Sequence, residues 1–239
     1  MAEIVVETEH LSMRFGGVVA VDGVDFRLRQ RELLCLIGPN GAGKTTFFRC
    51  LTGQHRPSGG DVWIGGRRTT GLPIHEIAHI GVGIKTQVPS LANGLPVREN
   101  LWLSARRRHA PRAADEQVER LLTELGLQTH ADQPAGQLAH GVRQMVEIGV
   151  AIASDPWLLL LDEPAGGLTH DEAERVGQLV RSLNQRMTVV VVGHDMAFVR
   201  SVAQRVVVFH QGRVLADGEP EAVLADARVR EVYLGSKVR

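Results

Sequence analysis

The sequence predicts an α/β fold built around a mostly parallel β-sheet. Three short apolar runs, at residues 33–37, 158–161 and 189–192, carry this prediction. Each run is continuously apolar instead of alternating, which is typical of strands that are buried on both faces. A helical pattern over residues 171–183 separates the last two runs. Strands that alternate with helices in this way form a parallel sheet with helices packed on its faces.

Before the first of these runs, the sequence predicts strands of a different kind. Residues 4–6 and 24–28 have strand composition, and the second run alternates apolar and polar residues. Such alternation indicates a strand with one buried and one exposed face. A turn at residues 57–60 leads into a further strand at 61–64, which two glycines follow.

The middle of the chain, from about residue 96 to 153, has helical patterning. Within residues 115–125 the apolar positions fall on one helical face, and Gly126 provides a stop signal. Residues 142–153 have a similar pattern. The remaining predicted elements are strands at 206–209 and 212–215 and a final helix at 220–224.

Composition excludes several classes of protein. The 239 residues carry 27 basic and 27 acidic side chains, so the net charge of +0 argues against a nucleic-acid-binding protein. The basic run 106–109, with Arg112, has the pattern of a solvated helix face, and contact with lipid head groups is the alternative. Cys35 and Cys50 fall in predicted core elements, which fits a reducing cytoplasm. The apolar runs are too short to span a bilayer, and the first residues lack a signal-peptide pattern.

Residues Gly38 to Thr45 read Gly-Pro-Asn-Gly-Ala-Gly-Lys-Thr, which matches the phosphate-loop pattern G-x-x-x-x-G-K-[ST]. The run follows a predicted strand and precedes a predicted helix, as the pattern requires. Glycines let the backbone curl so that its amides surround an anion. We expect Lys44 to reach the β- and γ-phosphates of a nucleotide and the Thr45 hydroxyl to coordinate Mg²⁺.

Polar residues follow two of the other predicted strands. Asp162 and Glu163 end the run at 158–161, and His194 comes just after the run at 189–192. Ligands of parallel sheets bind beyond the carboxyl ends of the strands. We therefore expect Asp162 to partner Mg²⁺, Glu163 to deprotonate an attacking water, and His194 to contact the γ-phosphate. Gln87, in a loop, has no such signal of its own.

Taken in order, these motifs resemble the ATP-binding subunits of ABC transporters over essentially the whole chain. The resemblance implies a P-loop NTPase core at about 1–86 and 155–239, with an antiparallel β part, and a helical subdomain at about 87–154. It gives Glu163, His194 and Gln87 catalytic roles, and it places Mg²⁺ on Thr45, Gln87 and Asp162. The ATP-binding residues that it implies are Phe15, Gly38, Pro39, Asn40, Gly41, Ala42, Gly43, Lys44, Thr45 and Thr46. For Phe15, a place in the core is the alternative to stacking on adenine.

Other segments narrow the resemblance. The stretches 138–141, 147–149 and 231–235 are similar to the subfamily that serves importers of branched-chain amino acids and of urea or short amides. The resemblance implies a second ATPase subunit, membrane permeases that dock near residues 88–95, and indirectly a solute-binding protein. It implies a cytoplasmic location on the inner face of the membrane. A lipopolysaccharide-exporting subfamily has similar motifs and remains an alternative.

One segment departs from the family pattern. Where the family has Leu-Ser-Gly-Gly-Gln, which completes the ATP site of a partner, this chain has Leu138, Ala139, His140, Gly141 and Val142. The missing serine removes one hydrogen bond to phosphate, and such a loss costs about 1 to 3 kcal/mol. The site that this chain completes is therefore expected to be weakened. A heteromeric pair follows as one interpretation, and a regulatory subunit with one degenerate site as another.

Overall fold

A six-stranded, mostly parallel sheet forms the centre of the molecule. The computed structural model describes residues 3–88 and 90–235. In spatial order the strands are β10 (Arg213–Gly218), β9 (Arg205–His210), β3 (Leu33–Ile37), β8 (Thr188–Val192), β7 (Leu158–Asp162) and β6 (Val82–Lys85). Only β10 is antiparallel to its neighbour. The parallel sheet predicted from the apolar runs is therefore present.

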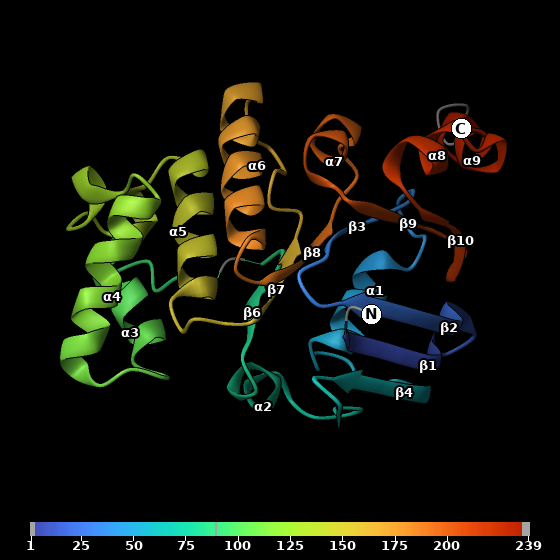
Figure 1. Ribbon diagram of the computed structural model, residues 1–239, viewed down its shortest axis with the longest axis horizontal. Coiled ribbons are helices and arrows are strands. Elements are labelled where there is room, and N and C mark those ends of the chain that lie inside the picture. The colour runs from blue at the N-terminus through green and yellow to red at the C-terminus, as the bar shows by residue number, and fades with distance from the viewer. Residues whose placement is uncertain (1–2, 89, 236–239) are drawn as a thin grey trace.

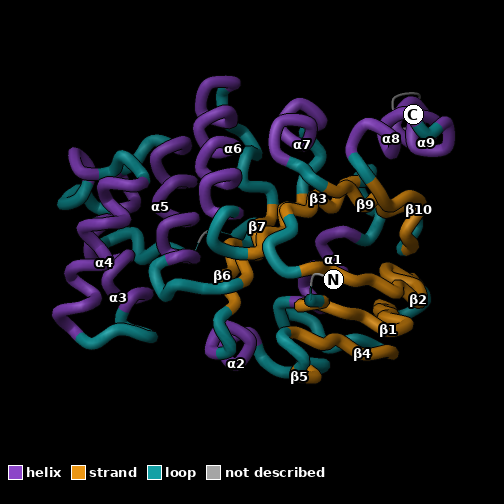
Figure 2. Tube along the Cα trace, viewed as in Figure 1, coloured by secondary structure: helices purple, strands orange, loops and turns teal. Residues whose placement is uncertain are grey.

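A second, antiparallel sheet packs beside the first (Figure 1). Its strands, in order, are β2 (Val18–Arg29), β1 (Ile4–Phe15), β4 (Gly59–Ile64) and β5 (Arg67–Arg68), and Figure 2 shows β5 at its edge. The first two strands are far longer than the predicted 4–6 and 24–28. Shifts in the pairing register between β1 and β2 interrupt the regular alternation, which explains why the sequence pattern marked only part of each strand.

The described part of the chain contains nine α-helices, of which the first seven lie between strands and the last two follow β10. They are α1 (Lys44–Leu51), α2 (Ile74–His79), α3 (Val97–Ala105), α4 (Pro111–Glu124), α5 (His140–Ile152), α6 (His170–Asn184), α7 (Met196–Val202), α8 (Pro220–Ala225) and α9 (Ala227–Gly235). The predicted final helix at 220–224 is thus followed by one more, α9. None of the described helices has the length and apolar character required to cross a membrane.

The two faces of the six-stranded sheet belong to different hydrophobic clusters. On β3, Cys35 and Ile37 pack in the cluster that includes the helices α5 and α6, whereas Leu34 and Leu36 pack with α1 and the antiparallel sheet. Figure 1 shows α5, α6 and α7 on one side of this sheet and α1 on the other. All five residues of β3 are buried, which is why its sequence is continuously apolar.

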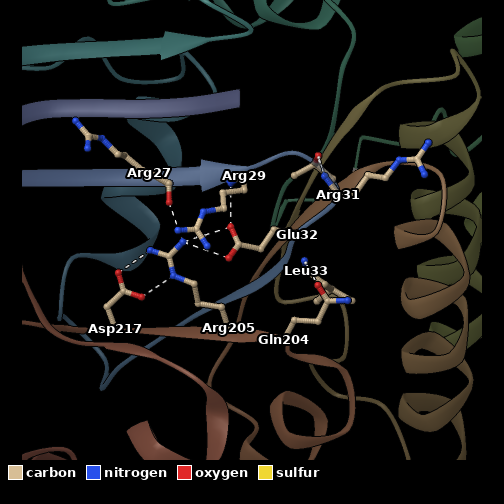
Figure 3. A network of polar contacts seen from close by, with 9 residues as sticks. Arg27, Arg29, Arg31, Glu32, Leu33, Gln204, Arg205 and Asp217 are labelled. Atoms are coloured by element: carbon tan, nitrogen blue, oxygen red, sulfur yellow. Dashed lines mark hydrogen bonds and ion pairs between the residues drawn. The ribbon is translucent and has the colours of Figure 1, made fainter. Parts of the chain in front are cut away.

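Charged side chains tie the two sheets together at the ends of β2 and β9. Arg205 of β9 donates two 2.6 Å hydrogen bonds to Asp217 of β10 and a third to the main-chain oxygen of Arg27 on β2 (Figure 3). Its guanidinium also lies 3.3 Å from Glu32, which in turn accepts a bond from the Arg29 amide. Asp217, and to a lesser extent Glu32, raise the pKa of Arg205, and the bonds to Arg27 and Glu32 fix the turn that leads into β3.

The helices α3, α4 and α5 form a separate group between β6 and β7. Those two strands are adjacent and parallel, with Val82 opposite Leu158 and Lys85 opposite Leu161. Figure 1 shows the three helices together at one end of the molecule. The helices α3, α4 and α5, called the helical layer below, are therefore inserted between two neighbouring strands of the sheet.

Candidate functional site

The loop from Gly38 to Thr45 connects β3 to α1, and its backbone requires glycine. Gly38 has φ 149°, and a Cβ there would lie 2.3 Å from the main-chain oxygen of Phe209. Gly43 caps α1 with φ 104°, and its Cβ would lie 2.4 Å from the oxygen of Ala20. Both values are in the region that favours glycine. The loop thus curls at the start of a helix, where backbone amides bind anions.

Lys44 lies inside this loop. Its ammonium donates to the main-chain oxygens of Gly38, at 2.8 Å, and Pro39, at 3.0 Å. Only 6% of the residue is exposed. Burial lowers the pKa of Lys44, and the negative charges of Glu163 and Asp162 oppose this shift. The loop therefore holds a cation where a phosphate would bind.

Asp162 ends β7 and is 2% exposed. Burial and the neighbouring Glu163 raise its pKa to about 6, although Lys85, Arg49 and Lys44 oppose the shift. Its Oδ1 atom is buried and has no hydrogen-bond partner among the described residues. A buried carboxylate oxygen of this kind is a suitable ligand for a hard cation such as Mg²⁺.

The next residue, Glu163, has an unusual backbone conformation. Its φ of 47° lies in the left-handed region, which is costly for residues other than glycine. Its amide donates to the oxygen of Val192 at 2.8 Å, so neighbouring β8 helps to fix this conformation. One carboxylate oxygen lies 3.1 Å from Nδ1 of His194, and the other accepts from Nε2 of Gln87 at 3.4 Å.

A surface cleft of about 370 Å³ brings most of the predicted residues together. Its walls are formed by Phe15, Ala20, residues 40–46, Gln87 and Glu163. His194 lines an adjoining pocket, which shares Glu163 with the cleft. Segments that are far apart in the sequence thus meet at the carboxyl ends of β3, β7 and β8, where ligands of parallel sheets bind.

Phe15 is at the surface, not in the core. It is 45% exposed and lines the cleft, with its ring centroid 5.4 Å from that of His55. The alternative of a core phenylalanine is therefore wrong for this residue. An exposed ring beside a phosphate loop is available to stack on a base.

The segment from Leu138 to Val142 lies outside this cleft. Ala139 caps α5, and Nε2 of His140 lies 3.0 Å from the oxygen of Gly166. Gly141 packs so closely against Glu172 that a Cβ would lie 2.1 Å from its carboxylate. No residue of the segment is among those that line the cleft with the phosphate loop. Within the segment, Ala139 and His140 are exposed, whereas Gly141 is buried and Leu138 and Val142 pack against the core.

The loop predicted to dock permeases, residues 88–95, is only partly exposed. Val88 is 70% exposed, and Pro89 lies outside the described residues. Leu91 is 8% exposed and packs in the core cluster of the helical layer, so it is not available to a partner. The exposed part of this apolar loop is smaller than its sequence indicates.

One charged residue near the site was not predicted. Lys85 ends β6 and is 4% exposed, with its ammonium 3.2 Å from the main-chain oxygen of Asp162. The signal for it was a lysine at the end of an apolar strand, two residues before Gln87. Buried lysines are rare unless they are paired, so we expect a carboxylate close to the Lys85 ammonium.

A family model described as "ABC transporter" matches residues 21–166 of the chain. The chain belongs to the ABC transporter ATP-binding family. A second model, "Branched-chain amino acid ATP-binding cassette transporter", matches residues 213–238 of the cassette. The region with the phosphate loop, Asp162 and Glu163 thus lies within the first match, and α9 lies within the second.

Named relatives match the cassette over nearly its whole length. BraF of Pseudomonas aeruginosa, a high-affinity branched-chain amino acid transport ATP-binding protein, is 37% identical over 98% of this chain and 99% of the relative. LivG of Escherichia coli, which has the same description, is 36% identical with the same coverage. LptB of Acidithiobacillus ferridurans, from a lipopolysaccharide export system, is 36% identical over 92% of each chain.

Solved structures share the fold of the cassette. The ADP conformation of MJ1267, an ATP-binding cassette of an ABC transporter, has a TM-score of 0.87 at 28% identity and covers 98% of this chain and 99% of that one. A dimeric post-hydrolysis state of MJ0796 bound to ADP and Pi has a TM-score of 0.81 at 25% identity and covers 90% and 98%. The predicted fold class is confirmed.

Proposed function

We propose that this cassette hydrolyses ATP to power a membrane importer for branched-chain amino acids, or for urea and short amides. The observation that carries the proposal is the cleft in which the phosphate loop faces Glu163, whose carboxylate contacts Gln87 and His194. Such a loop binds phosphates, and a carboxylate held beside it can take a proton from water. The named branched-chain amino acid transport relatives support the choice of solute.

ATP binding begins with the loop. Its amides and the start of α1 attract the β- and γ-phosphates, and the ammonium of Lys44 exchanges its carbonyl partners for phosphate oxygens. The exposed ring of Phe15 stacks on the adenine. Thr46, in the first turn of α1, lines the same cleft and contacts the phosphates.

Magnesium fits three residues near the phosphate loop, of which Thr45 and Gln87 line the cleft and Asp162 is buried. Thr45, Gln87 and Asp162 supply hydroxyl, amide and carboxylate oxygens, which are the ligands that Mg²⁺ prefers. Burial and the neighbouring Glu163 raise the pKa of Asp162 to about 6, and its Oδ1 atom has no partner among the described residues, which supports a role in binding a cation. When bound, the ion neutralises negative charge on the β- and γ-phosphate oxygens.

Hydrolysis uses the carboxylate of Glu163. A water placed between Glu163 and the γ-phosphate gives a proton to this carboxylate as its oxygen attacks phosphorus, and the bond to ADP breaks. Gln87 and His194 hold the two carboxylate oxygens, so the base points in one direction. The ring of His194 also lies beside the γ-phosphate in this arrangement and contacts it.

The working unit is a pair of ATPase subunits on the inner face of the membrane. The segment 138–142 of each subunit faces the phosphate loop of the other, and permeases bind the exposed part of loop 88–95. Ala139 and Val142 weaken the site that this chain completes, which favours pairing with a second, different ATPase. The solute-binding protein acts through the permeases.

Reconstitution tests this proposal. The purified cassette, joined with its membrane subunits in vesicles, is expected to hydrolyse ATP faster when a binding protein loaded with a branched-chain amino acid or urea is present. A Lys44→Ala variant provides the matched control, because it removes the cation from the phosphate loop. If wild-type ATP hydrolysis is absent, or does not respond to the loaded binding protein, the importer function is wrong.

The similarity to LptB supports lipopolysaccharide export as a second candidate. Stimulation by a lipid substrate, with no response to the binding protein, would favour it. A regulatory subunit is a third candidate, but the retained Glu163 and His194 favour an active site in this chain. Assays of the isolated cassette and of a mixed dimer distinguish these two roles.

A further inference from the structure

A buried ion pair joins the candidate site to the helical layer. The ammonium of Lys85, on β6, lies 3.6 Å from the carboxylate of Glu147, on α5. The two side chains are only 4% and 5% exposed. Arg143, one turn earlier on α5, lies 3.6 Å from the other oxygen of Glu147 and donates to the side chain of Asn93 at 2.8 Å.

This pair is poorly explained by stability alone. Removing two charges from water costs several kcal/mol per ion, and a buried pair seldom stabilises a fold more than apolar residues of the same size. Burial lowers the pKa of Lys85, and the charges of Glu147 and Asp162 only oppose that shift. A different role for the lysine follows from its second contact.

Lys85 also contacts the peptide group that joins Asp162 to Glu163. The carbonyl oxygen of this peptide accepts from the Lys85 ammonium at 3.2 Å, and its N–H donates to Val192 at 2.8 Å. Both polar atoms of one peptide are therefore held, from the strands on either side of β7. The next backbone angle is the left-handed φ of 47° at Glu163, which persists only where its surroundings hold it.

We propose that Lys85, held by Glu147, is a positioning residue that fixes the Asp162–Glu163 peptide and thereby orients two carboxylates, that of Glu163 in the cleft and that of the buried Asp162. Through Glu147 the same ammonium connects this peptide to α5, the helix that begins at His140. The inference rests on the proposed ATPase function. It adds a buried residue, outside the lining of the cleft, that acts through the backbone of Asp162 and Glu163.

The experiment removes both charges at once. In Lys85→Met/Glu147→Met the side chains keep similar volumes and both fully buried charges are removed, while the partly exposed Arg143 keeps its hydrogen bond to Asn93. We expect a melting temperature close to that of the wild type, kcat reduced at least tenfold, and KM for ATP within about twofold. If the pair were only structural, kcat would remain at the wild-type value.

A matched control comes from another ion pair between the same two parts of the molecule. Arg186 donates to Glu124 at 2.7 Å and joins α4 to the segment before β8, at the end of the sheet away from the cleft. The variant Arg186→Met/Glu124→Met is expected to keep wild-type kcat. An equal loss of kcat in this control would contradict the proposal.

A second readout does not depend on turnover. Hydrogen exchange of the Glu163 amide should quicken at least tenfold in Lys85→Met/Glu147→Met and stay unchanged in the control. Unchanged exchange overturns the proposal even if the wild type hydrolyses no ATP, whereas absent wild-type hydrolysis alone contradicts only the proposed function. If the methionine variant fails to fold, Lys85→Gln/Glu147→Gln takes its place, since glutamine is one atom shorter than lysine and its amides can bond each other. In that variant, too, unchanged kcat or unchanged hydrogen exchange of the Glu163 amide would contradict the proposal.

Discussion

Nδ1 of His194 lies 3.1 Å from Oε1 of Glu163. For a hydrogen bond to form, this ring nitrogen must carry the proton, because the carboxylate can only accept. The other carboxylate oxygen accepts from Gln87 at 3.4 Å. The base is thus held at both oxygens, by side chains that follow two different strands, while its own backbone is held at φ 47°.

Replacing the base separates binding from turnover. Glu163→Gln keeps the shape of the side chain but removes the proton acceptor, so we expect turnover to fall at least about 100-fold with unchanged ATP affinity. Single-turnover hydrolysis and binding of a fluorescent nucleotide measure the two effects. Glu174→Gln, at an exposed position on α6, is the control. Normal turnover in Glu163→Gln would remove Glu163 from the role of base.

Loss of the imidazole should affect kcat more than KM. His194→Ala removes a hydrogen bond to a charged group, which is worth about 1.5 to 3 kcal/mol, so turnover should fall roughly 10- to 150-fold. Steady-state kinetics with a titration of ATP measure both constants. His75→Ala, on the exposed side of α2, should leave them unchanged. A change in KM alone would mean that His194 binds ATP without orienting the base.

A methyl group at the end of the phosphate loop should abolish nucleotide binding. In Gly43→Ala the Cβ would lie 2.4 Å from the oxygen of Ala20, and the φ of 104° is strained for alanine. The left-handed conformation alone costs about 1 to 2 kcal/mol, so a lower melting temperature should accompany the loss of binding. Gly17→Ala is the control, because a Cβ at Gly17 meets nothing within 4 Å. Wild-type affinity in Gly43→Ala would show that the loop tolerates a different conformation.

Alkaline pH should destabilise the protein through a buried thiol. Burial raises the pKa of Cys35 from 9.0 to about 12. Above pH 9 the unfolded chain therefore loses this proton while the folded protein keeps it, so stability falls as pH rises. The free energy of unfolding of the wild type, relative to Cys35→Ala, should drop by about 1.4 kcal/mol per pH unit between about pH 9 and about pH 11.

Urea denaturation at several pH values measures this difference. Val191→Ala, at the β8 position opposite Cys35, also removes buried atoms but no titrating group. Its offset from the wild type should therefore be independent of pH. A constant difference between wild type and Cys35→Ala would show that the thiol does not titrate differently in the two states.

The sequence predicted the parallel sheet well because its strands are buried on both faces. The runs at 33–37, 158–161 and 189–192 coincide with β3, β7 and β8 to within one residue. Their polar ends then fall at one edge of the sheet by topology alone, which is why Asp162, Glu163 and the loop could be placed together.

Features that depend on contacts between distant segments were not predictable in the same way. The burial of Leu91 depends on its packing within the helical layer, and the pairing of Lys85 with Glu147 depends on α5 crossing next to β6. The left-handed backbone of Glu163 has no signal in the sequence, because neighbouring strands impose it. The strands β1 and β2 were predicted too short, because shifts in their pairing register interrupt the alternating pattern. The helix α9 was missed because a short helix gives only a weak periodic pattern.

The three helices α3 to α5 enter and leave the sheet through two strands that are hydrogen-bonded neighbours, with Val82 opposite Leu158. Between ends that lie side by side, doubling the length of an insertion raises the entropic cost of loop closure by only about 0.6 kcal/mol. The side of this layer that faces the sheet shares its hydrophobic core, whereas its outer side does not. Evolution can thus change the outer surface of the helical layer independently of the hydrolytic chemistry, as long as the contacts at Lys85 are kept.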